Sequence, residues 1–130
     1  MNAREELCIV VGDCQLAAAL EAELASSGRR VTTTGVESFC GIGRRVEDDS
    51  ELEQSWMGEA RAVVIAVIGD LEGAQTCILS ARAAAARRVI AFSWTAPHEE
   101  LLRRVGAGVV IRLDRLAAEA VLREVGKRSE

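Results

Sequence analysis

The sequence predicts an α/β fold in which an open parallel sheet carries helices on both faces. Two observations support this prediction. Short, continuous apolar runs alternate along the chain with longer segments in which apolar residues recur at helical spacing. The strongest run, residues 62–68, is apolar at every position, which is typical of a central strand buried on both faces. Strands and helices should therefore alternate and be joined by right-handed parallel crossovers.

The first part of the chain predicts a strand, a tight turn, a helix and a second strand. Residues 7–11 are continuously apolar, and Gly12-Asp13-Cys14 follows as a turn. Residues 15–26 place apolar side chains at helical spacing and end before Gly28, which suits the position after a helix. Residues 30–34 are rich in β-branched side chains and predict the second strand.

The middle of the chain predicts a shortened connection between the second and third strands. Three glycines in residues 35–48 indicate a flexible or tightly turning segment with almost no room for a helix. A short strand at 44–46 and a weak helix at 50–57 are expected to follow.

The second half continues the alternation of strands and helices. Strands are expected at 62–68, 88–93 and 109–111. Helices are expected at 71–86, from about Pro97 to Gly106, and at 115–125. The whole order is that of a Rossmann-like sheet, in which ligands bind at the carboxyl ends of the strands.

The composition limits the classes of function. The chain has 130 residues, of which 49% are hydrophobic, so we expect one domain over residues 1–130 with its own core. A formal charge of −4 argues against nucleic-acid binding through a broad basic surface. No run approaches about 18 consecutive apolar residues, and the polar start lacks the pattern of a secretory signal. We expect a cytoplasmic protein without direct membrane insertion.

The cysteines do not predict a metal site. Cys8, Cys14, Cys40 and Cys77 contain no close pair of the kind that zinc sites use. Cys8 and Cys77 fall in apolar elements and are expected in the core, whereas Cys14 and Cys40 are expected in loops. The pair Asp48-Asp49 could bind a divalent cation, but capping of the following helix is the better interpretation.

The turn after the first strand is the first candidate site. A dinucleotide fingerprint has glycine at its first two marked positions and a small residue at the third, and here these positions hold Gly12, Cys14 and Ala17. A cysteine at the second position crowds the place where a pyrophosphate approaches the backbone. The helix that starts at Gln15 still offers free N–H groups to an anion. Both a phosphate ligand and a turn without a ligand therefore remain open.

Other residues near strand ends have two interpretations each. The acidic residue that would hold a ribose is replaced by Gly35, and the nearest acid, Glu37, either substitutes for it or is a solvated loop charge. Asp70 follows Gly69 after the central strand and either caps the next helix or faces a ligand. Trp94, with Phe92, either anchors a protein contact or packs in the core. The chain has a single histidine and shows no nucleophile–base pair, so we expect neither catalytic residues nor an enzyme.

Three segments resemble an RCK domain, the regulator of potassium conductance, also called the TrkA N-terminal domain. They are residues 62–70 (AVVIAVIGD), 88–91 (RVIA) and 98–111 (HEELLRRVGAGVVI). The resemblance covers about residues 6–126, and we expect no smaller carboxy-terminal ligand domain of the kind that many members carry. It implies a Rossmann-type domain that binds NAD(H) or an adenine nucleotide, forms a homodimer and controls a potassium channel or transporter.

The resemblance and the turn together define candidate cofactor-binding residues. These are Gly12, Asp13, Cys14, Gln15, Ala17, Asp48, Gly69 and Asp70. Cys14 and Gly35 depart from the family pattern at the pyrophosphate and ribose positions. We therefore expect a regulatory subunit that senses a ligand or serves as a scaffold. The alternative is a degenerate domain that binds no nucleotide and acts as an interaction and dimerisation module.

Overall fold

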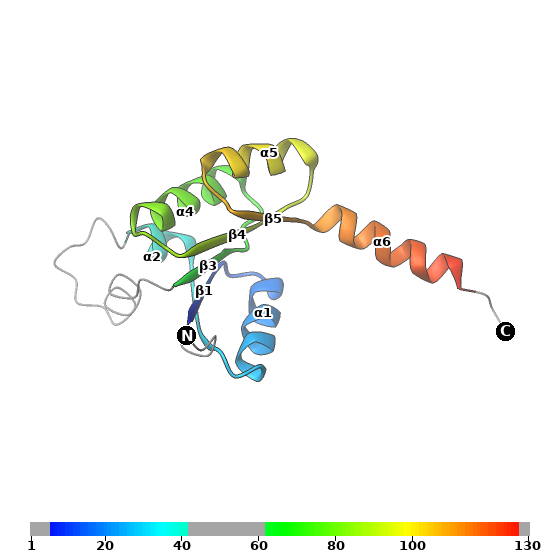
Figure 1. Ribbon diagram of the computed structural model, residues 1–130, viewed down its shortest axis with the longest axis horizontal. Helices are drawn as coiled ribbons and strands as arrows, with labels where there is room; N and C mark the ends of the chain where they lie inside the picture. Colours follow the sequence, from blue (N-terminus) through cyan, green and yellow to red (C-terminus); the bar gives the residue numbers. More distant parts are fainter. Residues whose placement is uncertain (1–5, 42–61, 128–130) are drawn as a thin grey trace.

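Five parallel strands form one sheet in the order β2-β1-β3-β4-β5 (Figure 1). The computed structural model describes residues 6–41 and 62–127. The strands are β1 (Leu7–Val11), β2 (Arg30–Thr34), β3 (Val63–Ala66), β4 (Arg88–Ser93) and β5 (Val109–Arg112). All four residues of the central strand β3 are buried, as its unbroken apolar run predicts. The predicted α/β class and parallel sheet are confirmed.

Helices cover the two faces of the sheet unequally (Figure 1). They are α1 (Gln15–Ser26), α2 (Val36–Gly41), α4 (Leu71–Ala83), α5 (Ala96–Val105) and α6 (Leu113–Gly126). Helix α1 lies on one face, whereas α2, α4 and α5 lie on the other, and α6 extends away from the sheet. No described helix is long and apolar enough to cross a membrane.

Each face of the sheet has its own core, because successive strand residues point to opposite faces. On one face Ile9 and Val64 pack with Ile78 and Leu102 beneath the helices α2, α4 and α5. On the other face Val10, Val63 and Ile65 pack with Ala17, Leu20 and Leu24 of α1. This double burial explains why β1 and β3 are apolar at every position.

Helix starts follow their sequence signals. The carboxylate of Asp70 accepts a hydrogen bond of 2.8 Å from the N–H of Gly73 at the start of α4. The hydroxyl of Thr95 accepts one of 3.3 Å from the N–H of His98, and Pro97 lies in the first turn of α5. Side-chain caps of this kind stabilise a helix by about 1 kcal/mol.

The structure corrects the expectation for residues 35–41. A turning connection without a helix was predicted, but α2 forms over Val36–Gly41, so Cys40 lies in a helix rather than in a loop. Burial accounts for it: Phe39 is 1% exposed within the larger core, and its N–H donates to the carbonyl of Gly35. The predicted strand at 44–46 and helix at 50–57 lie outside the described residues.

Other boundaries shift by a few residues. Helix α4 ends at Ala83, three residues before the predicted end, and Ala85 then adopts a positive φ of 61°. Strand β3 is shorter than the run 62–68, although Val67 still donates a hydrogen bond of 2.9 Å to the carbonyl of Val11. Cys8 and Cys77 are buried, as predicted.

Candidate functional site

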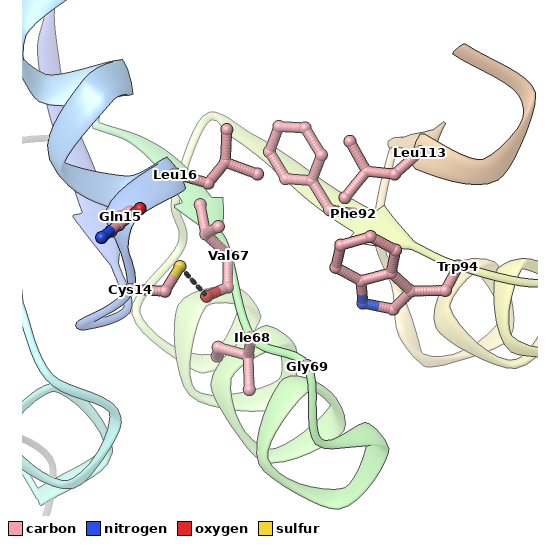
Figure 2. A pocket seen from close by; sticks show the side chains of 9 residues that line it. All are labelled: Cys14, Gln15, Leu16, Val67, Ile68, Gly69, Phe92, Trp94 and Leu113. Carbon is pink, nitrogen blue, oxygen red and sulfur yellow. Dashed lines mark hydrogen bonds between the residues drawn. The ribbon is translucent and has the colours of Figure 1, made fainter. Parts of the chain in front are cut away.

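A cavity of about 320 Å³ lies at the carboxyl end of the sheet, on the face that carries α1 (Figure 2). This is where a Rossmann-like sheet holds its ligands. The lining residues come from the start of α1, the segment after β3, the end of β4 and the start of α6. They are Cys14, Gln15, Leu16, Val67, Ile68, Gly69, Phe92, Trp94 and Leu113.

Gly12 sets the shape of the turn behind this cavity. Its φ is +152°, and a Cβ placed on it would lie 2.4 Å from the backbone carbonyl oxygen of Val67. Its N–H donates to the carbonyl of Thr34 at 2.9 Å, so the turn also contacts the end of β2. Only glycine suits this conformation and this close approach. The tight-turn role predicted for Gly12 agrees with this geometry.

Cys14 stands at the mouth of the cavity, at the N-cap of α1. Its thiol lies 3.9 Å from the carbonyl oxygen of Val67, and its side chain makes no capping hydrogen bond to α1 (Figure 2). The side chain therefore takes up room that a glycine would leave beside the helix N-terminus. Ala17, three residues later, is 1% exposed, as close packing of helix and sheet requires.

The cavity wall is mainly apolar. Figure 2 shows Leu16 and Val67 on one side and Phe92, Trp94 and Leu113 on the other. Gln15 is the only lining residue with a strongly polar side chain, and no described lining residue carries a charge. Such a wall suits an apolar partner better than a phosphate, because burying an anion without a compensating charge or hydrogen bonds is costly.

The predicted site residues separate into three groups. Cys14, Gln15 and Gly69 line the cavity, and Gly12 and Ala17 lie in the turn and helix behind it. Asp13 is exposed and does not line it.

The remaining acidic candidates do not contribute to the cavity. Asp70 is used as the cap of α4, which supports the capping interpretation over a ligand role. Glu37 is exposed on α2, across the sheet from α1, and is absent from the lining. Asp48 lies outside the described residues. The described residues contain no group of three or more side chains that could hold a metal ion.

Sequence reasoning missed most of the apolar wall. It left Phe92 and Trp94 between a protein contact and the core, and it named neither Leu16 nor Leu113 as site residues. Phe92 is 9% exposed, which fits packing in the core, whereas Trp94 is 52% exposed, which fits a protein contact. Their alternation around Ser93 was the available signal, since it places both side chains on one face. Ser93 itself is buried and donates to the carbonyl of Thr95 at 2.8 Å.

Comparisons with known proteins show the fold. No family model matches the sequence, and no curated protein matches it. Among solved structures, the chain is similar to the TrkA-N domain of the inner membrane protein ybaL from Escherichia coli. The identity is 18%, the match covers 92% of this chain and 96% of that chain, and the TM-score is 0.69. The resemblance to a TrkA N-terminal domain is therefore confirmed at the level of the fold.

The residues present do not fit the dinucleotide that this fold family implies. A pyrophosphate needs close access to the backbone at the second glycine position, which Cys14 occupies. A ribose needs an acidic side chain at the end of β2, where Gly35 stands. The wall of the cavity offers Phe92, Trp94 and Leu113 in place of polar partners. The cavity instead presents apolar surface at the place where the fold holds ligands.

Proposed function

We propose that this chain is a regulatory domain of the TrkA-N type that acts through protein contacts, including a homodimer, and not by holding a dinucleotide. The observation that carries the proposal is the apolar, uncharged wall of the cavity at the carboxyl end of the sheet. Trp94, half exposed at its edge, has the character of an interface anchor.

The regulated partner belongs to the class of membrane transport proteins. The structural neighbour is a domain of an inner membrane protein. The sequence resemblance implies control of a potassium channel or transporter. The domain works on the cytoplasmic side as a non-catalytic subunit. In support of this, the described lining residues include no histidine or carboxylate that could serve as a base for the Cys14 thiol.

Ligand sensing is the second candidate, with NAD(H) or an adenine nucleotide as the ligand. One observation favours it: no side chain caps the start of α1, so its N–H groups remain open to an anion. The turn that precedes this helix has glycine at the first position of the fingerprint, where a tight turn requires it.

Thermal unfolding with and without millimolar NAD⁺, NADH, ATP, ADP or AMP separates the two candidates. A ligand present at about 100 times its Kd adds roughly 2.7 kcal/mol, which corresponds to several degrees in a domain of this size. We expect no shift of the melting temperature with any of the five. An upward shift in the wild type would overturn the proposal and establish nucleotide sensing.

The Cys14→Gly variant is the matched test of the crowded turn. It removes the side chain that occupies the second glycine position and leaves the rest of the cavity intact. A shift that arises only in this variant would identify Cys14 as the obstacle to a nucleotide and support the proposal. If neither protein shows a shift, the apolar wall of the cavity, and not Cys14 alone, prevents nucleotide binding.

A further inference from the structure

Exposed arginines gather at the amino-terminal edge of the sheet. All the strands are parallel, so they start at one edge, and the helices α1, α4 and α5 run back to it. Two of the arginines are the first residues of strands, and the others lie just before these strands or in the last turn of α4. We name this group the arginine edge, and its residues are Arg29, Arg30, Arg82, Arg87 and Arg88.

The strand register spreads these arginines across the width of the sheet. Arg30 is level with Leu7 of β1, and Arg88 is level with Val63 of β3. Three strand spacings separate β2 from β4, which amounts to about 14 Å. Arg82 extends the group towards β5, because its side chain lies against Gly106, shortly before that strand. A broad target can therefore meet several guanidinium groups at once.

Few acidic groups neutralise the arginine edge. Glu6 pairs with Arg87 at 3.0 Å, and Glu23 lies in the last turn of α1. For five arginines against two glutamates, the excess is three positive charges in the described part of this edge. Within the part of the chain that the structure describes, neither Arg82 nor Arg88 forms an ion pair, so both guanidinium groups can bind an anion.

Compensation of helix dipoles accounts for only part of this pattern. The C-terminus of a helix carries a partial negative charge, which favours a basic residue in the last turn. Arg82 occupies such a position in α4, whereas α1 has no basic residue in its last turn. Arg30 and Arg88 are the first residues of strands and lie outside any helix. The arginine edge is therefore larger than the helix ends require.

The opposite edge of the sheet, where α6 begins, carries the opposite charge (Figure 1). Its described acidic residues outnumber its arginines by three, and the two groups are Asp13, Glu37, Asp70, Glu72 and Asp114 against Arg112 and Arg115. Helix α5 adds little to either edge, because Arg103 pairs with Glu99 and Arg104 pairs with Glu100. The described part of the domain thus has a positive end and a negative end.

We propose that the arginine edge docks the domain on an anionic lipid surface, with its guanidinium groups against the phosphates of the headgroups. A bilayer is planar and meets only one end of a domain, so a positive end and a negative end orient the chain on it. A guanidinium binds a phosphate through two parallel hydrogen bonds. The inference goes beyond the proposed function and rests on the distribution of charge.

Nucleic acid fits this edge less well than a lipid surface does. Trp94, the only exposed aromatic side chain among the described residues, lies at the opposite edge, so no described side chain of the arginine edge can stack on a base. The edge presents strand starts and helix ends, whereas reading a DNA groove requires a helix or a pair of strands that enters it.

The contact with lipid should be electrostatic. Among the described residues of this edge, Val109 is the one large apolar side chain that is well exposed, at 37%. A single valine gives little apolar surface to insert between lipids. Binding should therefore depend on the charge of the lipid and on the salt concentration.

Co-sedimentation of the full chain with lipid vesicles tests the proposal. Vesicles of phosphatidylcholine with about one third phosphatidylserine supply an anionic surface, and pure phosphatidylcholine vesicles supply a neutral one. We expect binding to the anionic vesicles alone. This binding should be lost when the salt concentration is raised from about 0.05 M to about 0.5 M.

Paired substitutions locate the contact. Arg82→Gln combined with Arg88→Gln should weaken binding to the anionic vesicles roughly 25-fold, because each basic residue near such a surface contributes a factor of about five. Glutamine keeps the aliphatic part of Arg82 that lies against Gly106, and far-UV circular dichroism verifies the fold. The matched control is Arg115→Gln with Arg123→Gln, which removes the same charge from exposed positions of α6 and should leave binding nearly unchanged.

Three results would overturn the proposal: no binding to the anionic vesicles, equal binding to both kinds of vesicle, or an equal loss of binding in the α6 control. Duplex DNA and polyglutamate serve as competing anions. If the wild type binds either of them more tightly than the anionic vesicles, and the substitutions at positions 82 and 88 abolish this binding, the arginine edge serves a nucleic acid or an acidic protein instead.

Discussion

At the scale of single residues, the turn after β1 depends on one glycine. Gly12 adopts a φ of +152° and brings the backbone against the carbonyl of Val67. Cys14, two residues later, fills the space that a second glycine would leave beside α1. The same short turn therefore combines a backbone that requires glycine at position 12 with a side chain at the position that a dinucleotide fingerprint gives to glycine.

Replacing Gly12 by alanine should strongly destabilise the domain. The new Cβ would meet backbone atoms of Val67 at 2.4 Å in a conformation that L-residues rarely adopt. We expect a loss of roughly 3 kcal/mol or more in the free energy of unfolding, measured with urea. Gly69→Ala is the matched control, since nothing lies within 4 Å of a Cβ at that position. Equal effects of the two substitutions would contradict the role given to Gly12.

At the scale of elements, the junction between β5 and α6 is held by charge. Arg112 joins Glu99 of α5 to Asp114 of α6, with only 18% of its side chain exposed. Hydrogen bonds from Arg103 and Arg112 lower the pKa of Glu99, and the bond from Arg112 lowers the pKa of Asp114. This network joins the end of β5 to the first turn of α5 and the first turn of α6.

The network should make stability depend on acid pH. Because both carboxyl pKa values are lower in the folded state, their contribution is present above about pH 4 and is lost as the pH falls through the folded-state values. In Arg112→Gln the urea midpoint should fall at neutral pH, and its difference from the wild type should shrink towards pH 2.5.

Arg104→Gln provides the comparison for this titration. Arg104 pairs with Glu100 at 2.7 Å, but both side chains are well exposed, so the substitution should change the midpoint little at any pH. If the urea midpoint of Arg112→Gln differs from that of the wild type by the same amount from pH 6 to pH 2.5, the network does not stabilise the fold by charge.

At the scale of the whole molecule, helices cover the two faces of the sheet to different extents. Among the described helices, α2, α4 and α5 close one face, whereas only α1 packs on the other and α6 extends away from the sheet (Figure 1). The homodimer proposed above would add a contribution from a second copy to the stability of the domain.

The melting temperature should accordingly depend on protein concentration. For a domain of this size that unfolds from a dimer, mass action raises it by about 2–3 °C for each tenfold increase in concentration. Calorimetry at several concentrations measures this dependence. A wild type whose melting temperature does not change with concentration would contradict association of the native state.

The sequence alone was enough to predict the sheet. Unbroken apolar runs identify β1 and β3 because both faces of these strands are buried, and helical spacing identifies α1 and α4. A short-range signal also offered the capping interpretation of Asp70, which lies directly before a helical segment. The departure at Cys14 was visible because a fingerprint specifies residue types at fixed positions in a single turn.

Only the tertiary structure decided α2, the wall of the cavity and the direction of α6. Helix α2 forms because Phe39 is buried in the larger core, beside residues that are distant in the sequence, which no local pattern reports. The cavity unites Cys14, Val67, Phe92 and Leu113 from four separate segments, and their apolar character as a group emerges only on folding. A helical sequence pattern indicates which face needs burial but not which surface covers it. The direction of α6 depends on its junction with β5, because α6 begins at Leu113, directly after Arg112, without an intervening loop.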